Sequence, residues 1–100
     1  MNQQERDEYL ALGHTGIGWL RIIVDLDRKL AEIDPDYTIE QVKEKFGGLR
    51  YYFDSKEHQE EMYQLVKEAE NLCWQTCETC GSTEGVARSS RGRVGCPLHQ

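Results

Sequence analysis

Four residues near the end of the chain constrain the fold most, because they form two pairs with the spacing of metal ligands. Cys77 and Cys80 are separated by two residues, as are Cys96 and His99, and fifteen residues lie between the pairs. A two-residue spacer lets a tight turn direct both side chains at one ion, and Zn²⁺ prefers four tetrahedral sulfur and nitrogen ligands. The spacing therefore predicts one structural Zn²⁺ per chain, held by all four side chains.

Three alternatives would use some of the same residues. A redox pair at Cys77 and Cys80 would leave Cys96 and His99 without a role, and a disulfide framework suits an oxidising compartment. A catalytic zinc ion needs an open position for water, and four protein ligands leave none. Cys73 lies one helical turn before Cys77 and could extend the ligand set. Its place on an apolar helical stripe instead indicates a buried small side chain.

The residues between the two ligand pairs predict a short hairpin. Residues 86–88 would form the outgoing strand, 89–92 the turn and 93–95 the returning strand. Gly81, directly after Cys80, would allow the backbone to turn beneath the metal. This arrangement is that of a zinc ribbon or zinc knuckle.

Upstream of the metal ligands, the sequence predicts three helices. Residues 2–12 are expected to form a short polar helix. Longer helices are expected over 17–33 and 55–75, where apolar side chains recur at helical spacing, the second of them capped by Asp54 or Ser55. The stripes expected to be buried are Trp19, Ile22, Ile23, Leu26, Leu30 and Ile33 in the first, and Met62, Leu65, Val66, Ala69, Leu72 and Cys73 in the second.

The segment between the two longer helices, residues 38–53, admits two interpretations. It could be a helix that ends at Gly47, or a hairpin in which Gly47 and Gly48 form a two-residue turn and Val42 lies opposite Phe53. We favour the hairpin because it separates apolar from polar side chains. The expected apolar face is Val42, Phe46, Leu49, Tyr51 and Phe53, and the expected polar face is Gln41, Lys43, Lys45, Arg50 and Tyr52.

The length and composition fit one small unit that a metal ion would help to stabilise. Of 100 residues, 38% are hydrophobic and 30% charged, which leaves little apolar surface to bury. We therefore expect an α+β fold in which helices pack on a small β-hairpin. A helical and hairpin body at 1–75 and a zinc-binding ribbon at 76–100 would form one compact unit.

Charge is distributed unevenly along the chain. Residues 1–70 hold nine Lys or Arg against sixteen Asp or Glu, whereas 71–100 hold three Arg against two Glu. An acidic body disfavours strong non-specific binding to nucleic acid and suits a protein partner or simply solubility. No apolar run approaches the roughly 18 residues that span a bilayer, and the first residues are acidic and polar. We therefore expect a cytoplasmic protein with no membrane partner.

Several of these segments together carry a family resemblance. The run Val-Lys-Glu-Lys-Phe-Gly-Gly-Leu-Arg-Tyr-Tyr at 42–52 precedes a long helix, then Thr-Cys-Glu-Thr-Cys-Gly at 76–81 and Cys-Pro-Leu-His at 96–99. The chain resembles a group of small uncharacterised zinc-ribbon proteins of phages and prophages. The resemblance covers about residues 17–99, including Gly-Trp at 18–19. It implies a small phage-type zinc protein and no particular activity. A phage origin would in turn favour a host or defence component as the target, in the host cytoplasm.

Two groups of basic residues are candidate binding surfaces. The polar hairpin face could receive phosphate, nucleotide, RNA or an acidic protein surface, or it could be an ordinary solvated face with lysines that protect an edge. The arginines at the tip of the ribbon could contact phosphate or belong to a solvated loop. The residues concerned are Lys43, Lys45, Arg50 and Tyr52 on the hairpin, and Arg88, Arg91 and Arg93 on the ribbon.

These features predict a non-catalytic protein-interaction module, such as a phage-encoded modulator or inhibitor of a host or defence protein. The alternative is a nucleic-acid or nucleotide-binding zinc ribbon that uses the Lys and Arg residues of the two surfaces. An enzyme is the weakest hypothesis, because no catalytic triad, phosphate-binding loop or paired-carboxylate motif is present. His14 and His58 have no acid or nucleophile partner in the sequence.

Overall fold

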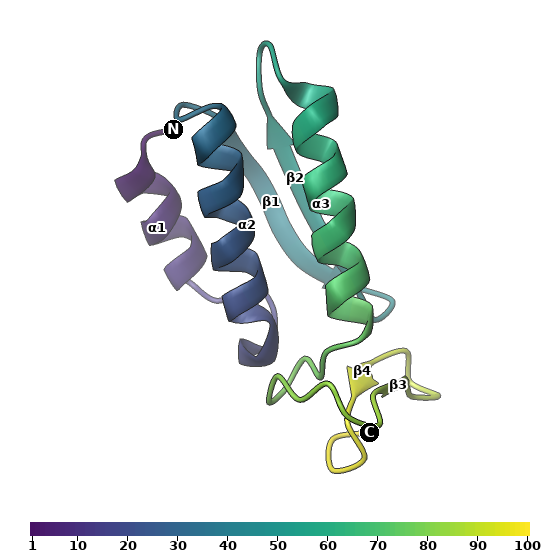
Figure 1. Ribbon diagram of the computed structural model, residues 1–100. Helices are drawn as coiled ribbons and strands as arrows, with labels where there is room; N and C mark the ends of the chain where they lie inside the picture. Colours follow the sequence, from purple (N-terminus) through teal and green to yellow (C-terminus); the bar gives the residue numbers. More distant parts are fainter.

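The computed structural model describes residues 1–100 as three helices and two small antiparallel hairpins, with the Cys/His cluster at the C-terminal end. α2 and α3 lie side by side over one face of the first hairpin, α1 lies beside α2, and the second hairpin follows below (Figure 1). The expected α+β class is confirmed. The elements are α1 (Gln3–Ala11), a 3₁₀ turn (Ile17–Trp19), α2 (Leu20–Ile33), β1 (Thr38–Lys45), β2 (Gly48–Asp54), α3 (Gln59–Trp74), β3 (Ala87–Arg88) and β4 (Val94–Gly95).

α2 supplies the centre of the hydrophobic core. Together with its 3₁₀ turn it covers the helix expected over 17–33, and its buried side chains follow the 3.6-residue period. Ile22 and Ile33 are only partly buried at the edge of the stripe. The core that α2, α3 and the hairpin share contains Trp19, Ile23, Leu26, Leu30, Tyr37, Ile39, Val42, Leu49, Tyr51, Phe53, Met62, Val66, Ala69 and Cys73.

β1 and β2 form the hairpin that the sorting of side chains favoured, but the expected turn is wrong by one residue. Phe46 and Gly47 occupy the turn, with φ angles of 55° and 87°, and Gly48 begins β2. Val42 consequently lies opposite Tyr51. The pairing differs from the expected one by two positions. Because side chains alternate with period two, a shift of two leaves the strand residues on their expected faces.

The turn is displaced because other parts of the molecule lie against both glycines. A Cβ atom on Gly47 would be 2.6 Å from the carbonyl oxygen of Gly92, and one on Gly48 would be 2.9 Å from Cζ2 of Trp74. Phe46 therefore takes the remaining turn position, in the left-handed region that glycine or asparagine normally fills. It is 66% exposed, so its expected place on the apolar face is wrong.

α3 begins four residues later than expected. Ser55 remains in the loop, where its Oγ accepts a 3.3 Å hydrogen bond from the His58 amide and its own amide donates to Gln59 Oε1 at 2.9 Å. These two bonds resemble a capping box, but the N-cap position is His58, and neither Asp54 nor Ser55 caps the helix. Leu72 is half-exposed, contrary to expectation, whereas Met62, Val66, Ala69 and Cys73 are buried.

α1 is attached to the core through a buried polar network that the sequence did not predict. Arg6 donates from Nε to Asp27 Oδ1 at 2.8 Å, and both side chains are almost fully buried. Tyr37 donates to the same carboxylate oxygen at 2.5 Å and lies 2.6 Å from the Tyr51 hydroxyl. Burial raises the pKa of both tyrosines well above the ordinary value. The network joins α1, α2 and the hairpin.

Candidate metal centre

The first ligand pair lies in a tight turn directly after α3. The Gly81 amide donates to the Cys77 carbonyl at 2.9 Å, with Gly81 at φ +83°, and the Cys77 amide donates to the Ser82 carbonyl at 2.8 Å. This turn brings Cys80 back toward Cys77, as the two-residue spacing predicted. Cys77 is buried, whereas Cys80 is exposed. We call residues 77–81 the knuckle.

The second ligand pair follows the short β3–β4 hairpin, which matches the ribbon expected over 86–95. Ala87 lies opposite Gly95 and the Ser89 amide donates to the Arg93 carbonyl at 2.7 Å. After β4 the chain turns again, and the His99 amide donates to the Cys96 carbonyl at 2.9 Å. The hairpin thereby delivers Cys96 and His99 to the knuckle.

The four donor atoms all lie within 4.8 Å of one another. Sγ of Cys80 is 3.8 Å from Sγ of Cys96, and Nδ1 of His99 is 3.6 Å from Sγ of Cys77 and 3.1 Å from Sγ of Cys96. A tetrahedral ion with metal–sulfur bonds of about 2.3 Å needs sulfur–sulfur separations of about 3.8 Å. The cysteines form no disulfide. The four residues fit a single ion and could hold it.

The thiols of the cluster influence one another. Burial raises the pKa of Cys77. Hydrogen bonds from the main-chain amides of Cys96, Cys80 and Thr79 have the larger, opposite effect, and the pKa falls to about 6. The Ser82 amide lowers the pKa of Cys80, yet burial and the neighbouring sulfurs of Cys77 and Cys96 outweigh it and raise that pKa. Adjacent thiolates repel one another, and a bound cation would relieve that repulsion.

The knuckle is attached directly to the loop that precedes α2. The Gly18 amide donates to the Glu78 carbonyl at 2.7 Å, and the Gly16 amide donates to Glu78 Oε2 at 2.8 Å. The Trp19 indole donates to the Thr76 carbonyl at 2.8 Å. A Cβ atom on Gly18 would be 2.2 Å from the Cys77 carbonyl oxygen, so only glycine fits there. The metal centre and the body therefore share one interface.

Glu78 is a buried acidic residue beside the candidate metal ligands whose contacts the sequence did not predict. It is only 3% exposed, and Arg93 Nη2 lies 3.1 Å from its Oε1 at an angle that makes no hydrogen bond. Arg93 also pairs with Glu44 Oε1 at 3.1 Å, and Glu44 Oε2 accepts from the Gly47 amide at 2.7 Å. This chain of contacts links the knuckle to the first hairpin. No spacing motif in the sequence marks it.

The structure brings the two expected basic surfaces together at their turns. Arg88 Nε lies 3.4 Å from the point where a Cβ on Gly47 would be, so the ribbon arginines border the first hairpin. Lys43 Nζ lies 5.8 Å from the ring of Tyr52. Of the expected binding residues, only Arg93 forms ion pairs; Lys43 and Arg50 are half-buried, and Lys45, Tyr52, Arg88 and Arg91 are exposed.

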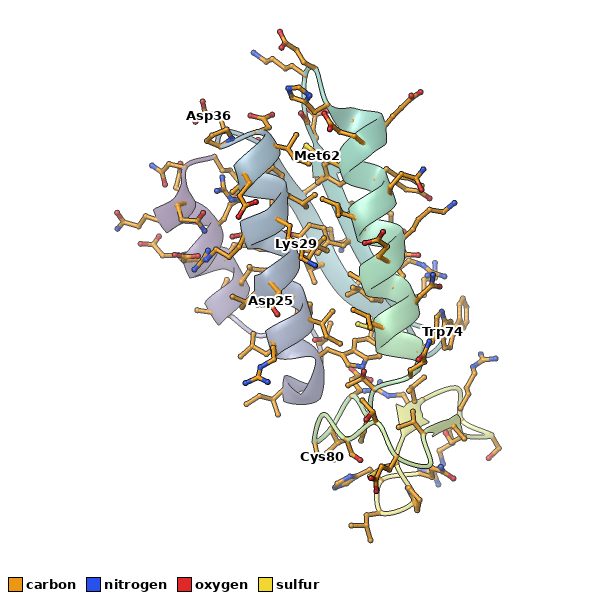
Figure 2. All side chains as sticks on the ribbon, viewed as in Figure 1. Asp25, Lys29, Asp36, Met62, Trp74 and Cys80 are labelled. Atoms are coloured by element: carbon orange, nitrogen blue, oxygen red, sulfur yellow. The ribbon has the colours of Figure 1, made fainter.

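Trp74, for which no role was expected, also belongs to this region. It lies at the end of α3 that faces the metal-binding lobe, in which Cys80 is found (Figure 2). Its indole is 41% exposed, whereas Trp19 is fully buried. The only sign of this partial exposure in the sequence is the position of Trp74 next to the buried Cys73, which places the indole at the edge of the apolar stripe of α3.

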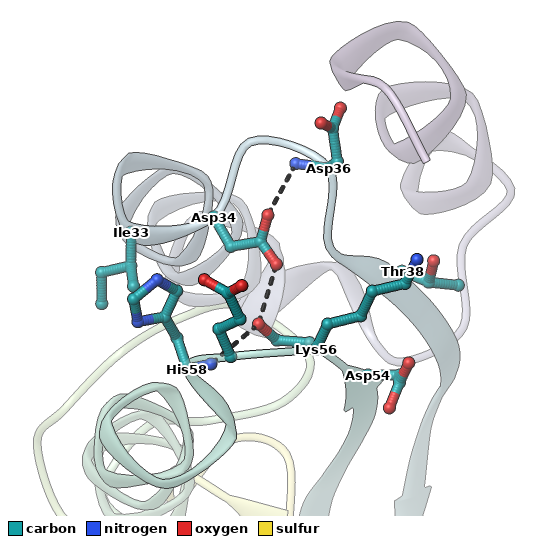
Figure 3. Close-up of a pocket in the computed structure, with 9 residues that line it drawn as sticks. Ile33, Asp34, Asp36, Thr38, Asp54, Lys56 and His58 are labelled. Atoms are coloured by element: carbon teal, nitrogen blue, oxygen red, sulfur yellow. Dashed lines mark hydrogen bonds between the residues drawn. The ribbon is translucent and has the colours of Figure 1, made fainter.

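A hollow lies at the end of the molecule opposite the metal centre, between the α2–β1 connection and the β2–α3 loop (Figure 3). One of its carboxylates, that of Asp34, is satisfied by neighbouring groups. Asp34 accepts from the Ser55 hydroxyl at 2.7 Å and from the Asp36 amide at 3.1 Å, and the hydroxyl lowers the pKa of Asp34. His58 Nδ1 is 2.6 Å from Glu61 Oε1.

None of the helices combines the length and apolar character required to cross a membrane. Comparison with protein-family models, with curated proteins and with solved structures finds no match for this chain.

Proposed function

We propose that this chain is a small, zinc-stabilised, non-catalytic protein-interaction module. The observation that carries the proposal is the closed Cys₃His cluster, whose four donor atoms lie within 4.8 Å. Three thiolates and one imidazole favour Zn²⁺ over harder cations, and four protein ligands leave no position for a reacting water. A zinc ion bound there would supply folding energy.

The metal centre would fix the loop between α1 and α2, because the knuckle is bonded to Gly16 and Gly18. This loop carries large apolar side chains that face solvent: Leu12 is 75% exposed and Ile17 76%. With Leu20, they form what we call the apolar rim. Two of the rim residues, Ile17 and Leu20, line a cavity of about 220 Å³ whose lining is chiefly aliphatic.

An exposed apolar rim beside a preformed cavity supports a protein partner. Contiguous exposed aliphatic side chains mark interaction sites on small proteins, and an apolar side chain of a partner would fill the cavity. The acidic charge of the chain, a net −6, would keep it dissolved in the absence of that partner. The resemblance to phage proteins supports a host or defence protein as the partner, in the host cytoplasm.

The zinc part of the proposal is tested by elemental analysis of the purified chain. We expect one equivalent of zinc, and loss of both the metal and the fold of the C-terminal lobe in Cys77→Ser. Cys73→Ala is the matched control, since that thiol is buried in the core away from the cluster and its replacement should leave the metal bound. Full folding of Cys77→Ser without metal would contradict a structural role.

The interaction part is tested by capture from bacterial lysate with three forms of the chain. Ile17→Asp places a charge on the apolar rim, and Leu98→Asp places the same charge on a side chain that is 89% exposed in the metal-binding lobe. We expect a partner that binds the native chain and Leu98→Asp at micromolar concentration but does not bind Ile17→Asp. Binding that survives Ile17→Asp would exclude the rim as the interface, and the absence of any partner would refute the function.

A further inference from the structure

The turn of the first hairpin presents an aromatic ring under backbone strain. Phe46 has φ +55°, a region that bulky residues rarely occupy, and its ring is 66% exposed. Asn or Asp would fill this turn position without strain. Lys45 Nζ lies 5.6 Å from the ring centre. A strained and exposed aromatic residue has no role in the core, and such outliers concentrate at binding sites.

A second exposed ring lies against the same turn. The indole of Trp74 is 41% exposed, and its Cζ2 lies 2.9 Å from the point where a Cβ on Gly48 would be. Nη1 of Arg50 lies 3.4 Å from that point. A flat indole and a guanidinium group therefore both lie next to the position that a side chain on Gly48 would occupy.

Four cations around these rings have no acidic partner, and the one carboxylate at the turn, Glu44, is already bound to Arg93 and to the Gly47 amide. Lys43 lies directly opposite Arg50 in the hairpin, an arrangement of like charges that destabilises a sheet. Arg88 lies against Gly47, on the other side of the turn. Lys43, Lys45, Arg50 and Arg88 form no ion pair, although the chain has eighteen acidic residues. These four cations are therefore available to a bound anion.

We propose that this end of the molecule binds single-stranded nucleic acid. Bases would stack on Phe46 and Trp74, and the guanidinium and ammonium groups would contact phosphates, the combination used by proteins that bind single strands. The surface, which we call the hairpin-end surface, consists of Lys43, Lys45, Phe46, Arg50, Trp74 and Arg88.

A single strand fits better than a duplex or an acidic protein. A chain of net charge −6 repels a polyanion, so phosphate contacts to four cations would give little affinity unless stacking added to it. A duplex keeps its base faces stacked within the helix, and a carboxylate-rich peptide has no rings to place on Phe46 and Trp74. Only an unpaired strand offers both bases for the aromatic rings and phosphates for the cations of the surface. The inference does not depend on the apolar rim, which contains none of these residues.

Fluorescence anisotropy with a labelled oligothymidine of about 15 nucleotides, in about 50 mM salt, tests the proposal. We expect the native chain to bind. The Kd should rise roughly tenfold in Trp74→Ala, in Phe46→Ala and in Arg88→Gln. Arg88 is exposed, so its variant keeps the fold even if Trp74→Ala does not. Tyr63→Ala is the matched control: Tyr63 is 46% exposed on α3, with Lys67 Nζ 5.4 Å from its ring, and should leave the Kd unchanged.

Stacking of bases on Trp74 can be measured separately, by tryptophan fluorescence. Of the two tryptophans only Trp74 is exposed, so quenching of intrinsic fluorescence by the oligonucleotide should disappear in Trp74→Phe. No binding by the native chain, or equal binding by Phe46→Ala and Arg88→Gln, would overturn the proposal. Equal or tighter binding of a glutamate oligomer would overturn it in favour of an acidic protein segment, and tighter binding of the matching duplex would exclude stacking. None of these outcomes affects the test at Ile17.

Discussion

Replacement of Asp27 by asparagine should destabilise the protein severely. Its carboxylate is fully buried and accepts from Arg6 and Tyr37 on Oδ1, and from Gln3 and Arg28 on Oδ2. Asparagine has nearly the same shape, but its side-chain nitrogen is a hydrogen-bond donor. In either orientation that nitrogen would face two other donors, either Arg6 and Tyr37 or Gln3 and Arg28. Arg6, which is 1% exposed, would keep its charge without a counter-ion. The substitution thus leaves a buried charge unpaired while changing the packing little.

The expected magnitude follows from that burial. Removing one partner of a buried ion pair costs about 3–5 kcal/mol of unfolding free energy, whereas domains of this size have about 5–15 kcal/mol in total. With a urea m value of roughly 1–3 kcal/mol/M, the midpoint should fall by about 2 M. Arg6→Lys should also destabilise, because an ammonium group cannot replace the guanidinium that also donates to the carbonyls of Met1 and Pro35.

Urea unfolding followed by far-ultraviolet circular dichroism measures these effects. Asp7→Asn is the matched control, because Asp7 pairs with Arg28 at the same 2.8 Å separation but on the surface, where both side chains are about half exposed. Solvent screens that pair, so the control should change the midpoint little. If Asp27→Asn lowered the midpoint no more than Asp7→Asn, the buried network could not be what attaches α1 to the core.

Three further predictions concern other parts of the chain. Gly47→Ala should destabilise more than Gly13→Ala, because both glycines have positive φ but only Gly47 has a carbonyl oxygen within 2.6 Å of an added Cβ; equal thermal shifts would contradict this contact. Burial holds the pKa of Tyr37 and Tyr51 above the unfolded value of 10.0, so the folded state keeps protons that the unfolded state releases. These tyrosines should leave the unfolding free energy unchanged below about pH 10 and lower it above that pH by about 1.4 kcal/mol per pH unit for each tyrosine. A urea midpoint that stayed constant from about pH 10 to 12 would refute this. Burial raises the pKa of Cys73 to about 12, so mass spectrometry should find this thiol unmodified by iodoacetamide in the folded chain, even after chelation exposes the other cysteines.

The long helices and the metal ligands could be predicted because each depends on local spacing. The stripe in α2 repeats with the helical period over fourteen residues, and the ligand pairs each fit one tight turn. The hairpin could also be predicted, since its faces depend only on alternation along the strands. In all three cases the information lies within a short stretch of sequence.

The features that the sequence did not predict depend on contacts between distant residues. Gly-Gly is normally a turn, and nothing nearby shows that Trp74 lies against Gly48 and moves the turn to Phe46. Arg6 lies in a short helix with few apolar residues, and its burial depends on the distant Asp27. Asp27 itself offered one indication, because it interrupts the apolar face of α2 between Ile23 and Leu30. A charged residue at such a position needs a buried partner.

The contact between the knuckle and the loop before α2 has a consequence for how this sequence can diverge. Added Cβ atoms on Gly16 and Gly18 would meet main-chain oxygens of Glu78 and Cys77 at 2.3 and 2.2 Å, so no side-chain replacement on the knuckle could make room for them. Two segments about sixty residues apart must therefore be conserved together. Descendants should retain Gly-x-Gly-Trp wherever they retain Cys-x-x-Cys-Gly, and that combination would identify relatives after the rest of the sequence had changed.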